Sequence, residues 1–168
     1  MALNLSYGLY EVLDGRIYQV RGFDLANMTF VLGETGWIVL DPLTLRETSA
    51  AALALVREHV ADLPVSAVVY THGEPDDHCG ARGVEHEPDV ARARVEEISP
   101  AGHAEYDKPG LGPALGAGPL PATITIEGAE QELAVDGVRM VVRTTGCNPE
   151  PAELDVHLPE LGAVRLAE

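Results

Sequence analysis

The sequence predicts a β-rich α/β fold in which short strands pack against at least one long helix. Short runs rich in β-branched and aromatic residues recur along the chain, and one stretch between them changes to helical periodicity. The chain has 168 residues, 46% of them apolar, which is enough for one domain with a hydrophobic core. We therefore expect a single domain over residues 1–168.

The first 40 residues contain three predicted strands. Gly15–Gly22 follows a turn signal at Asp14-Gly15. Asn27–Leu32 and Trp37–Leu40 are separated by Gly-Glu-Thr-Gly, a loop of hairpin length and composition. Their content of β-branched and aromatic residues indicates a buried or half-buried sheet.

Thr44–Val60 has the periodicity of a helix, with Thr44 as a plausible N-cap and Glu47 three residues later. Its predicted inner face consists of Leu45, Ser49, Ala52, Leu53, Val56 and Val60. The following run, Val65–Tyr70, predicts a strand parallel to Trp37–Leu40, because a helix connects the two.

The second half is again strand-like, after a weakly patterned region. Val95–Ser99 is a further candidate strand, and the Gly-, Pro- and Ala-rich stretch 108–121 predicts a loop inside the domain. From Thr123 onward the runs TITIEG, QELAVDG and VRMVVRTTG predict strands, and Leu154–Leu158 and Ala163–Ala167 predict another pair.

The net charge of −16 excludes nucleic acid as an expected partner, because such a surface repels phosphate backbones. An anionic substrate would need local positive charge that the chain as a whole does not supply. We expect Cys79 and Cys147 to be small buried residues rather than a disulfide framework. No apolar stretch is long enough for a membrane span, and no secretory leader is recognisable, so a cytoplasmic protein is expected.

The chemistry is concentrated in Thr71–Gly80, THGEPDDHCG, which follows the predicted strand Val65–Tyr70. The carboxyl end of a strand is the usual position of a site in open α/β sheets. Imidazoles and carboxylates crowded on a tight loop can converge on a metal ion, which also relieves their mutual repulsion. The alternative is a solvated acidic turn. The candidate metal ligands of this loop are His72, Glu74, Asp76, Asp77 and His78.

The sequence closely resembles the alkyl sulfatases of the metallo-β-lactamase superfamily. The resemblance lies in Tyr7–Ala26, MTFVLGETGWIVLDPLT, SAVVYTH followed by GARGV, Ala129–Arg139, and PEPAELDVHLPELGAVRLAE. It covers most of the chain except about 85–121. It implies a metallo-β-lactamase-like αβ/βα sandwich that is truncated or incomplete here, and two bound zinc ions.

The loop departs from the family pattern THxHxDHxGG. His72 matches the first histidine, and Glu74 replaces the second. Without a gap Asp76 matches the family aspartate and Asp77 replaces a histidine; with a slip of one residue, Asp77 and His78 supply the Asp-His pair. The spacing of His72, Glu74 and Asp76 also resembles the diiron branch of the superfamily, which includes flavodiiron proteins, and oxygen ligands suit iron or manganese.

Two later acidic ligands are implied by the resemblance, and they fall near Glu150 and on Glu168. For these residues and for Glu153 an ordinary solvated carboxylate is equally compatible. Asp41, at a neighbouring strand end, is expected either to orient a ligand from outside the metal shell or only to end its strand.

The implied activity is metal-dependent hydrolysis of a sulfate ester or a related ester by metal-bound hydroxide. The first metal site would comprise His72, Glu74, Asp77 and His78, and the second Asp76, Glu150 and Glu168; catalysis would depend on Asp76 and Asp77. The altered loop leaves two alternatives, a non-catalytic metal-binding or interaction protein and iron-dependent oxidation chemistry. The last predicted strand leaves an open sheet edge, so we expect a homo-oligomer or a partner chain to cover it.

Overall fold

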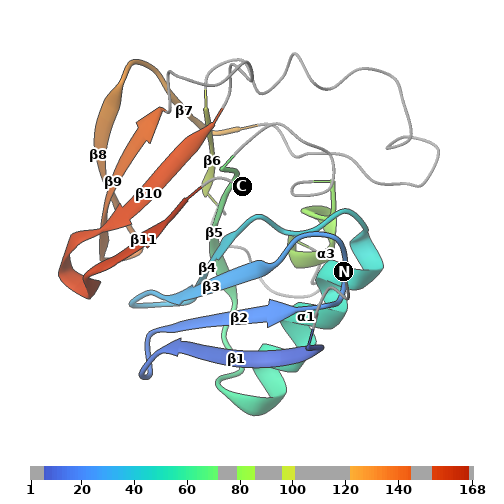
Figure 1. Cartoon of the computed structure of the whole chain (residues 1–168). Coiled ribbons are helices and arrows are strands. Elements are labelled where there is room, and N and C mark those ends of the chain that lie inside the picture. Colours follow the sequence, from blue (N-terminus) through green and yellow to red (C-terminus); the bar gives the residue numbers. More distant parts are fainter. Residues whose placement is uncertain (1–5, 72–78, 86–95, 101–121, 145–152, 167–168) are drawn as a thin grey trace.

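Two β-sheets and a helical layer make up the described part of the molecule (Figure 1). The computed structural model describes residues 6–71, 79–85, 96–100, 122–144 and 153–166. The larger sheet contains β1 (Gly8–Leu13), β2 (Ile17–Arg21), β3 (Met28–Leu32), β4 (Trp37–Leu40), β5 (Val65–Val69), β6 (Glu96–Pro100) and β7 (Ile124–Ile126), in that order. The smaller sheet has the order β11 (Ala163–Arg165), β10 (Leu154–Leu158), β9 (Val138–Thr144) and β8 (Glu130–Val135), and the helices are α1 (Arg46–His59), α3 (Arg82–Glu85) and the 3-10 turn η2 (Pro159–Leu161).

The predicted strands are confirmed, with one addition. Strand β1 has a mixed burial pattern and pairs with β2 antiparallel at the outer edge of the sheet, so its sequence carries no clear apolar alternation. The chain turns between them at Gly15, whose φ of 63° favours glycine. β11 is shorter than predicted and ends at Arg165.

The predicted parallel pairing of the strands on either side of α1 is also confirmed. β4 pairs antiparallel with β3 and parallel with β5, and β6 and β7 continue the parallel part. The register shifts between Trp37 and Ile38, which pair with Val65 and Ala67. The extra residue, Ser66, is a bulge that keeps the faces of the two strands in step.

The start of α1 corrects the sequence interpretation. The N-cap is Leu45, and no side chain caps the helix. Thr44 instead donates its hydroxyl to Asp24 Oδ1 at 3.0 Å, and Thr48 donates to Asp24 Oδ2 at 2.8 Å. A tertiary carboxylate therefore binds the hydroxyl that local sequence rules assign to the cap.

The larger sheet buries both of its faces. α1 places Ser49, Ala52, Leu53 and Val56 against the face that carries Trp37 and other large side chains. The opposite face, which includes Ile38 and Leu40, packs against the smaller sheet. Because β4 is covered on both sides, all four of its residues are buried, which explains its continuous apolar run.

A single carboxylate joins the two sheets at the end away from the carboxyl end of β5. Asp136, in the β8–β9 turn, accepts hydrogen bonds from Thr35 N, Thr35 Oγ1 and Gly36 N in the β3–β4 loop. Burial by itself raises the pKa of this carboxyl, but the hydrogen bonds from Thr35, Ser66 and Gly36 outweigh it, so that the pKa lies below its ordinary value. These hydrogen bonds, the Asp136 clasp, fix this end of the smaller sheet on the larger one.

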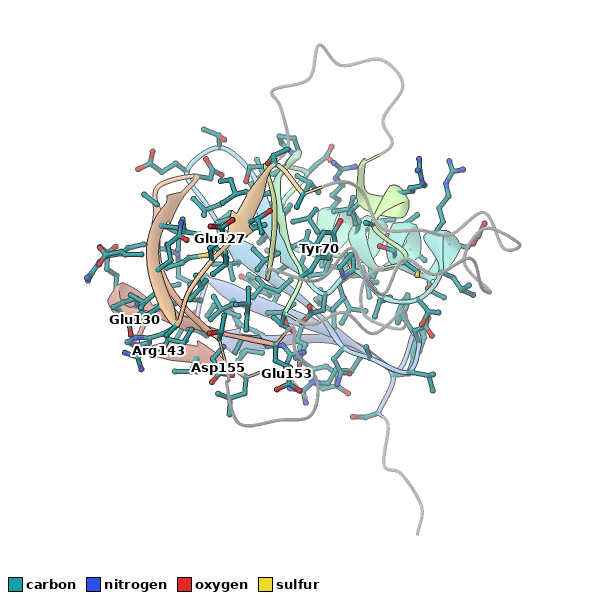
Figure 2. All side chains as sticks on the ribbon, turned by 90° about the horizontal axis from the view of Figure 1, so that it is seen from above. Tyr70, Glu127, Glu130, Arg143, Glu153 and Asp155 are labelled. Carbon is teal, nitrogen blue, oxygen red and sulfur yellow. The ribbon has the colours of Figure 1, made fainter. Side chains whose placement is uncertain are left out.

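The outer face of the smaller sheet is polar where β8, β9 and β10 lie side by side. Glu130, Arg143 and Asp155 are cross-strand neighbours there (Figure 2), and Arg143 Nε lies 2.5 Å from Glu130 Oε2. β11 is one of the two edge strands of this sheet in the described residues, and Val164 and Leu166 at this edge are more than half exposed. None of the described helices is long and apolar enough to cross a membrane.

Candidate metal centre

The carboxyl ends of β4 and β5 lie side by side, because the two strands are parallel neighbours. Asp41 follows β4, and Tyr70 and Thr71 follow β5, so both segments leave the sheet at the same edge. Asp41 N donates to Val69 O at 3.0 Å, and Tyr70 N donates to Ile98 O at 2.9 Å. The candidate metal segment 72–78 starts at this edge.

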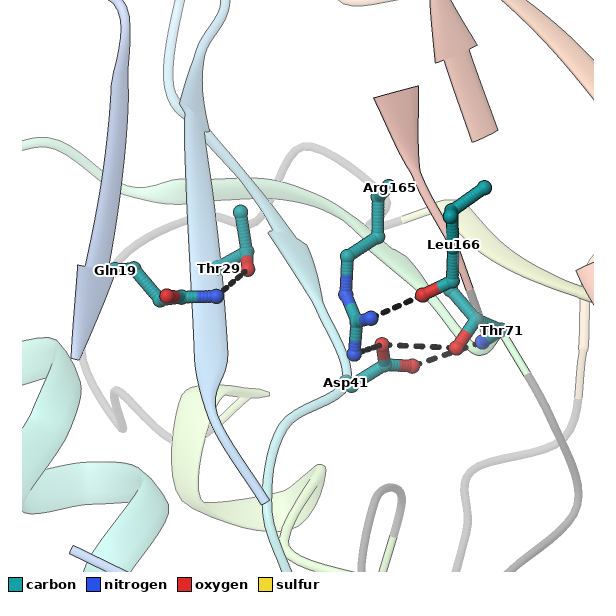
Figure 3. A network of polar contacts seen from close by, with 6 residues as sticks. All are labelled: Gln19, Thr29, Asp41, Thr71, Arg165 and Leu166. Carbon is teal, nitrogen blue, oxygen red and sulfur yellow. Dashed lines mark hydrogen bonds and ion pairs between the residues drawn. The ribbon is translucent and has the colours of Figure 1, made fainter. Parts of the chain in front are cut away.

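Asp41 is the central polar residue of this edge (Figure 3). Its side chain is fully buried, and its Oδ1 accepts the Thr71 amide at 2.8 Å. Its Oδ2 accepts the Thr71 hydroxyl at 2.9 Å and Arg165 Nη2 at 3.0 Å. Both oxygens of Asp41 therefore bind protein groups, so the residue does more than end its strand, and its role toward a metal ligand stays a prediction.

The turn after Asp41 has a strained backbone. Asp41 and Leu43 have φ values of 55° and 64°, in the left-handed region that non-glycine residues seldom adopt. Aspartate tolerates this region, whereas for a fully buried leucine it requires support from the surroundings. Strain of this kind is typical of segments that hold functional groups in place.

Gly80 packs against this turn from the other side of the candidate segment. Its amide donates to Leu43 O at 2.7 Å. A Cβ on Gly80 would lie 2.2 Å from Pro42 O, so only glycine fits. Thr71 directly precedes the segment 72–78, and Gly80 follows it after Cys79. Both residues contact the short stretch from Asp41 to Leu43. Cys79, next to Gly80, is buried, as predicted.

The smaller sheet also reaches this edge, through the start of β10. Leu154 N donates to Thr71 O at 2.5 Å. Glu153, which precedes it, is buried at 8% exposure, although the sequence is equally compatible with a solvated carboxylate. Figure 2 shows Glu153 at the start of β10, so the structure places one of the later acidic residues beside the strand end that carries Asp41 and Thr71.

The predicted metal ligands lie outside the described residues: His72, Glu74, Asp76, Asp77, His78, Glu150 and Glu168. Cys147 lies outside them as well. Within the described residues, no group of three His, Cys, Asp or Glu side chains is arranged to hold a metal ion. What the described structure provides is a frame of contacts around Asp41, and this frame binds the chain just before and just after 72–78.

Sequence reasoning missed Thr71, Arg165 and Gly80 as parts of this frame. Thr71 and Arg165 are 94 residues apart in the chain, and they come together because both bind Asp41 Oδ2. Gly80 carried a signal, since a glycine that follows an acidic loop and precedes a helix often marks a close approach of two backbones.

Comparisons with known proteins show the family and the fold. The family model of the metallo-beta-lactamase superfamily matches residues 21–158. The alkyl/aryl-sulfatase BDS1 of Saccharomyces cerevisiae is 30% identical over 200 residues, which cover 99% of this chain and 31% of that protein. A linear primary-alkylsulfatase of Pseudomonas sp is 48% identical over 104 residues, which cover 62% of this chain and 15% of that protein.

Solved structures show the same relationship. The sec-alkylsulfatase Pisa1 from Pseudomonas sp. is 30% identical, with a TM-score of 0.79, over 92% of this chain and 30% of that chain. A beta-lactamase domain protein from Burkholderia ambifaria has a TM-score of 0.68 at 19% identity, over 93% of this chain and 52% of that chain, and so shares the fold. The chain spans about a third or less of the length of the sulfatases that it matches.

Proposed function

Because the chain belongs to the metallo-beta-lactamase superfamily, we propose that it is a metal-dependent hydrolase of sulfate esters or related esters. Its similarity to alkyl sulfatases supports the substrate class. The observation that carries the proposal is that Thr71 and Gly80, which flank 72–78 in the chain, both contact the stretch from Asp41 to Leu43 at the carboxyl ends of β4 and β5. Water would add to the ester, and an alcohol and inorganic sulfate would leave.

The donor set suits a divalent metal ion by its chemistry. Imidazole nitrogen and carboxylate oxygen are ligands for zinc, and a larger share of oxygen ligands favours iron or manganese. His72, Glu74, Asp77 and His78 would hold a first ion, and Asp76, Glu150 and Glu168 are candidates for a second. A bound ion would supply Lewis acidity to the ester and lower the pKa of water at the site.

The described residues contribute positioning and charge. Asp41 holds the Thr71 amide and hydroxyl, so that the backbone enters the ligand-bearing segment in one orientation. Arg165 brings a positive charge to this edge of a chain with a net charge of −16, although Asp41 neutralises most of it. Bound metal would add positive charge that attracts an anionic ester to the site.

Metal analysis and a hydrolysis assay test the proposal. The purified chain should contain zinc, iron or manganese, and it should release inorganic sulfate from a linear alkyl sulfate in a reaction that a chelator stops. Asp76→Ala and Asp77→Ala, made singly, should show which aspartate supports binding; the affected variant should bind metal at least about tenfold more weakly.

Two results would contradict the proposal. If the protein contains no metal and its melting temperature does not change on addition of zinc, iron or manganese, the site does not bind metal. If metal binds tightly but sulfate release does not exceed that of the Asp76→Ala and Asp77→Ala variants, the chain is a non-catalytic metal-binding protein.

A further inference from the structure

We propose that Arg165 is a positioning residue of the candidate metal centre: its ion pair with Asp41 fixes the strand-end turn that holds both Thr71 and Gly80. The inference rests on the proposed function for its consequence in metal binding. Its structural part concerns only described residues and can be tested in metal-free protein.

The first step of the argument is the charge of Asp41. A carboxylate with no exposed surface requires a cationic or strongly hydrogen-bonding partner to remain ionised. Arg165 provides the cation: its Nη2 lies 3.0 Å from Asp41 Oδ2, and its own side chain is only 14% exposed. The pair joins the end of β4 in the larger sheet to the end of β11 in the smaller sheet (Figure 3).

The second step is the orientation of the carboxylate. Arg165 and the Thr71 hydroxyl both bind Oδ2, which leaves Oδ1 directed at the Thr71 amide. The same carboxylate belongs to a residue in the left-handed region, with φ 55°. Fixing the carboxylate from two sides therefore also fixes the backbone of the turn.

The third step extends this effect to Gly80. The carbonyl of Leu43, two residues after Asp41, accepts the Gly80 amide at 2.7 Å. Leu43 itself is strained at φ 64°, so its carbonyl direction depends on the turn being held. Arg165 is thus connected to Thr71 through Asp41, and to Gly80 through the turn from Asp41 to Leu43.

The guanidinium group is used in a way that lysine cannot copy. Nη2 binds Asp41, Nη1 binds the Leu166 carbonyl, and Nε is buried with no partner in the described structure. A lysine ammonium retains the charge but cannot reach both acceptors from one fixed plane. Arg165→Lys should therefore preserve folding and weaken the positioning.

The test compares amide hydrogen exchange in the metal-free full chain, residue by residue. In Arg165→Met the protection of the Thr71 and Gly80 amides should fall at least about tenfold more than that of core amides such as those of Val39 and Val142, which report only the general loss of stability. In Arg165→Lys the loss at the same two amides should be at least about threefold. Arg143→Met is the matched control, because it makes the same change in charge at an exposed ion pair and should leave Thr71 and Gly80 unchanged.

Zinc affinity, measured by competition with a chromophoric chelator, supplies the second readout. It should fall about 10- to 100-fold in Arg165→Met and stay unchanged in Arg143→Met. If the wild-type chain binds no zinc, iron or manganese, the proposed function fails, whereas the exchange comparison still decides the role of Arg165.

Several outcomes would overturn the inference. One is unchanged protection of Thr71 and Gly80 in Arg165→Met. Another is a loss that is equal at every core amide, because that would show only a general structural role. If Arg165→Met does not fold, Arg165→Lys decides: full wild-type protection at both amides, or a loss spread over the whole core, refutes positioning by Arg165.

Discussion

Replacement of Gly80 by alanine tests how tightly the turn after β4 holds the candidate metal segment. The new Cβ would lie 2.2 Å from Pro42 O, 2.8 Å from Leu45 O and 2.9 Å from Leu43 O. All three are main-chain oxygens, so no side chain can rotate away to make room. Either Gly80 or the turn must move, although the turn already includes Leu43 in the left-handed region.

Two costs contribute to the expected effect of Gly80→Ala. Overpacking against a rigid backbone costs about 1–3 kcal/mol. Movement of Gly80 also breaks its 2.7 Å hydrogen bond to Leu43 O, and burial of the unpaired groups costs about 1–2 kcal/mol more. The free energy of unfolding should therefore fall by about 2–5 kcal/mol, which corresponds to a decrease of about 5–15 °C in Tm for a chain of this size.

Urea unfolding followed by fluorescence can measure this change, because the chain has one tryptophan and Trp37 is fully buried. Gly162→Ala is the comparison variant. Gly162 has φ 60° and no atom within 4 Å of an added Cβ, so its substitution costs only the left-handed conformation, about 1–2 kcal/mol. If Gly80→Ala is no more destabilising than Gly162→Ala, the turn is adaptable and the argument for a rigid frame is wrong.

Two further variants test the packing of the sheets. Asp136→Ala removes the acceptor of Thr35 N, Thr35 Oγ1 and Gly36 N and should lower the free energy of unfolding by about 1–3 kcal/mol at pH 7. Hydrogen bonds lower the pKa of Asp136 in the folded state, so its contribution to stability is present above the unfolded pKa and is lost as the pH falls through the folded pKa. The Tm difference between Asp136→Ala and wild type should therefore shrink in acid. A Tm difference that stays constant with pH would contradict the role of the Asp136 clasp. Trp37→Phe removes the Nε1 hydrogen bond to Ala61 O and opens a cavity under α1. The free energy of unfolding, measured by circular dichroism, should therefore fall by about 2–4 kcal/mol, and a decrease below about 1 kcal/mol would contradict this packing.

Local patterns in the sequence determined most of the secondary structure. The runs that became β3, β4 and β5 are short, mostly apolar and rich in β-branched residues, and a sheet buries them. The 3.6-residue period of α1 identified the face that packs on Trp37. Edge strand β1 escaped prediction because partial exposure removes the alternation on which such prediction depends.

The start of α1 could not be predicted from local sequence rules. Thr44 has the sequence context of an N-cap, but Asp24 binds its hydroxyl and the helix begins after Leu45. The acceptor of this hydroxyl is a carboxylate 20 residues away in the chain, and the sequence near Thr44 does not indicate that contact.

The same division applies to the candidate metal centre. The sequence by itself determined the family, the position of THGEPDDHCG after β5 and the chemical types of its candidate ligands, because these depend on residue identity and strand order. Only the tertiary structure decided that Asp41 binds Thr71 and Arg165, and that Gly80 packs on the turn that follows. Those contacts join residues as far as 124 positions apart, and they exist because the two sheets pack with the ends of β4 and β11 together.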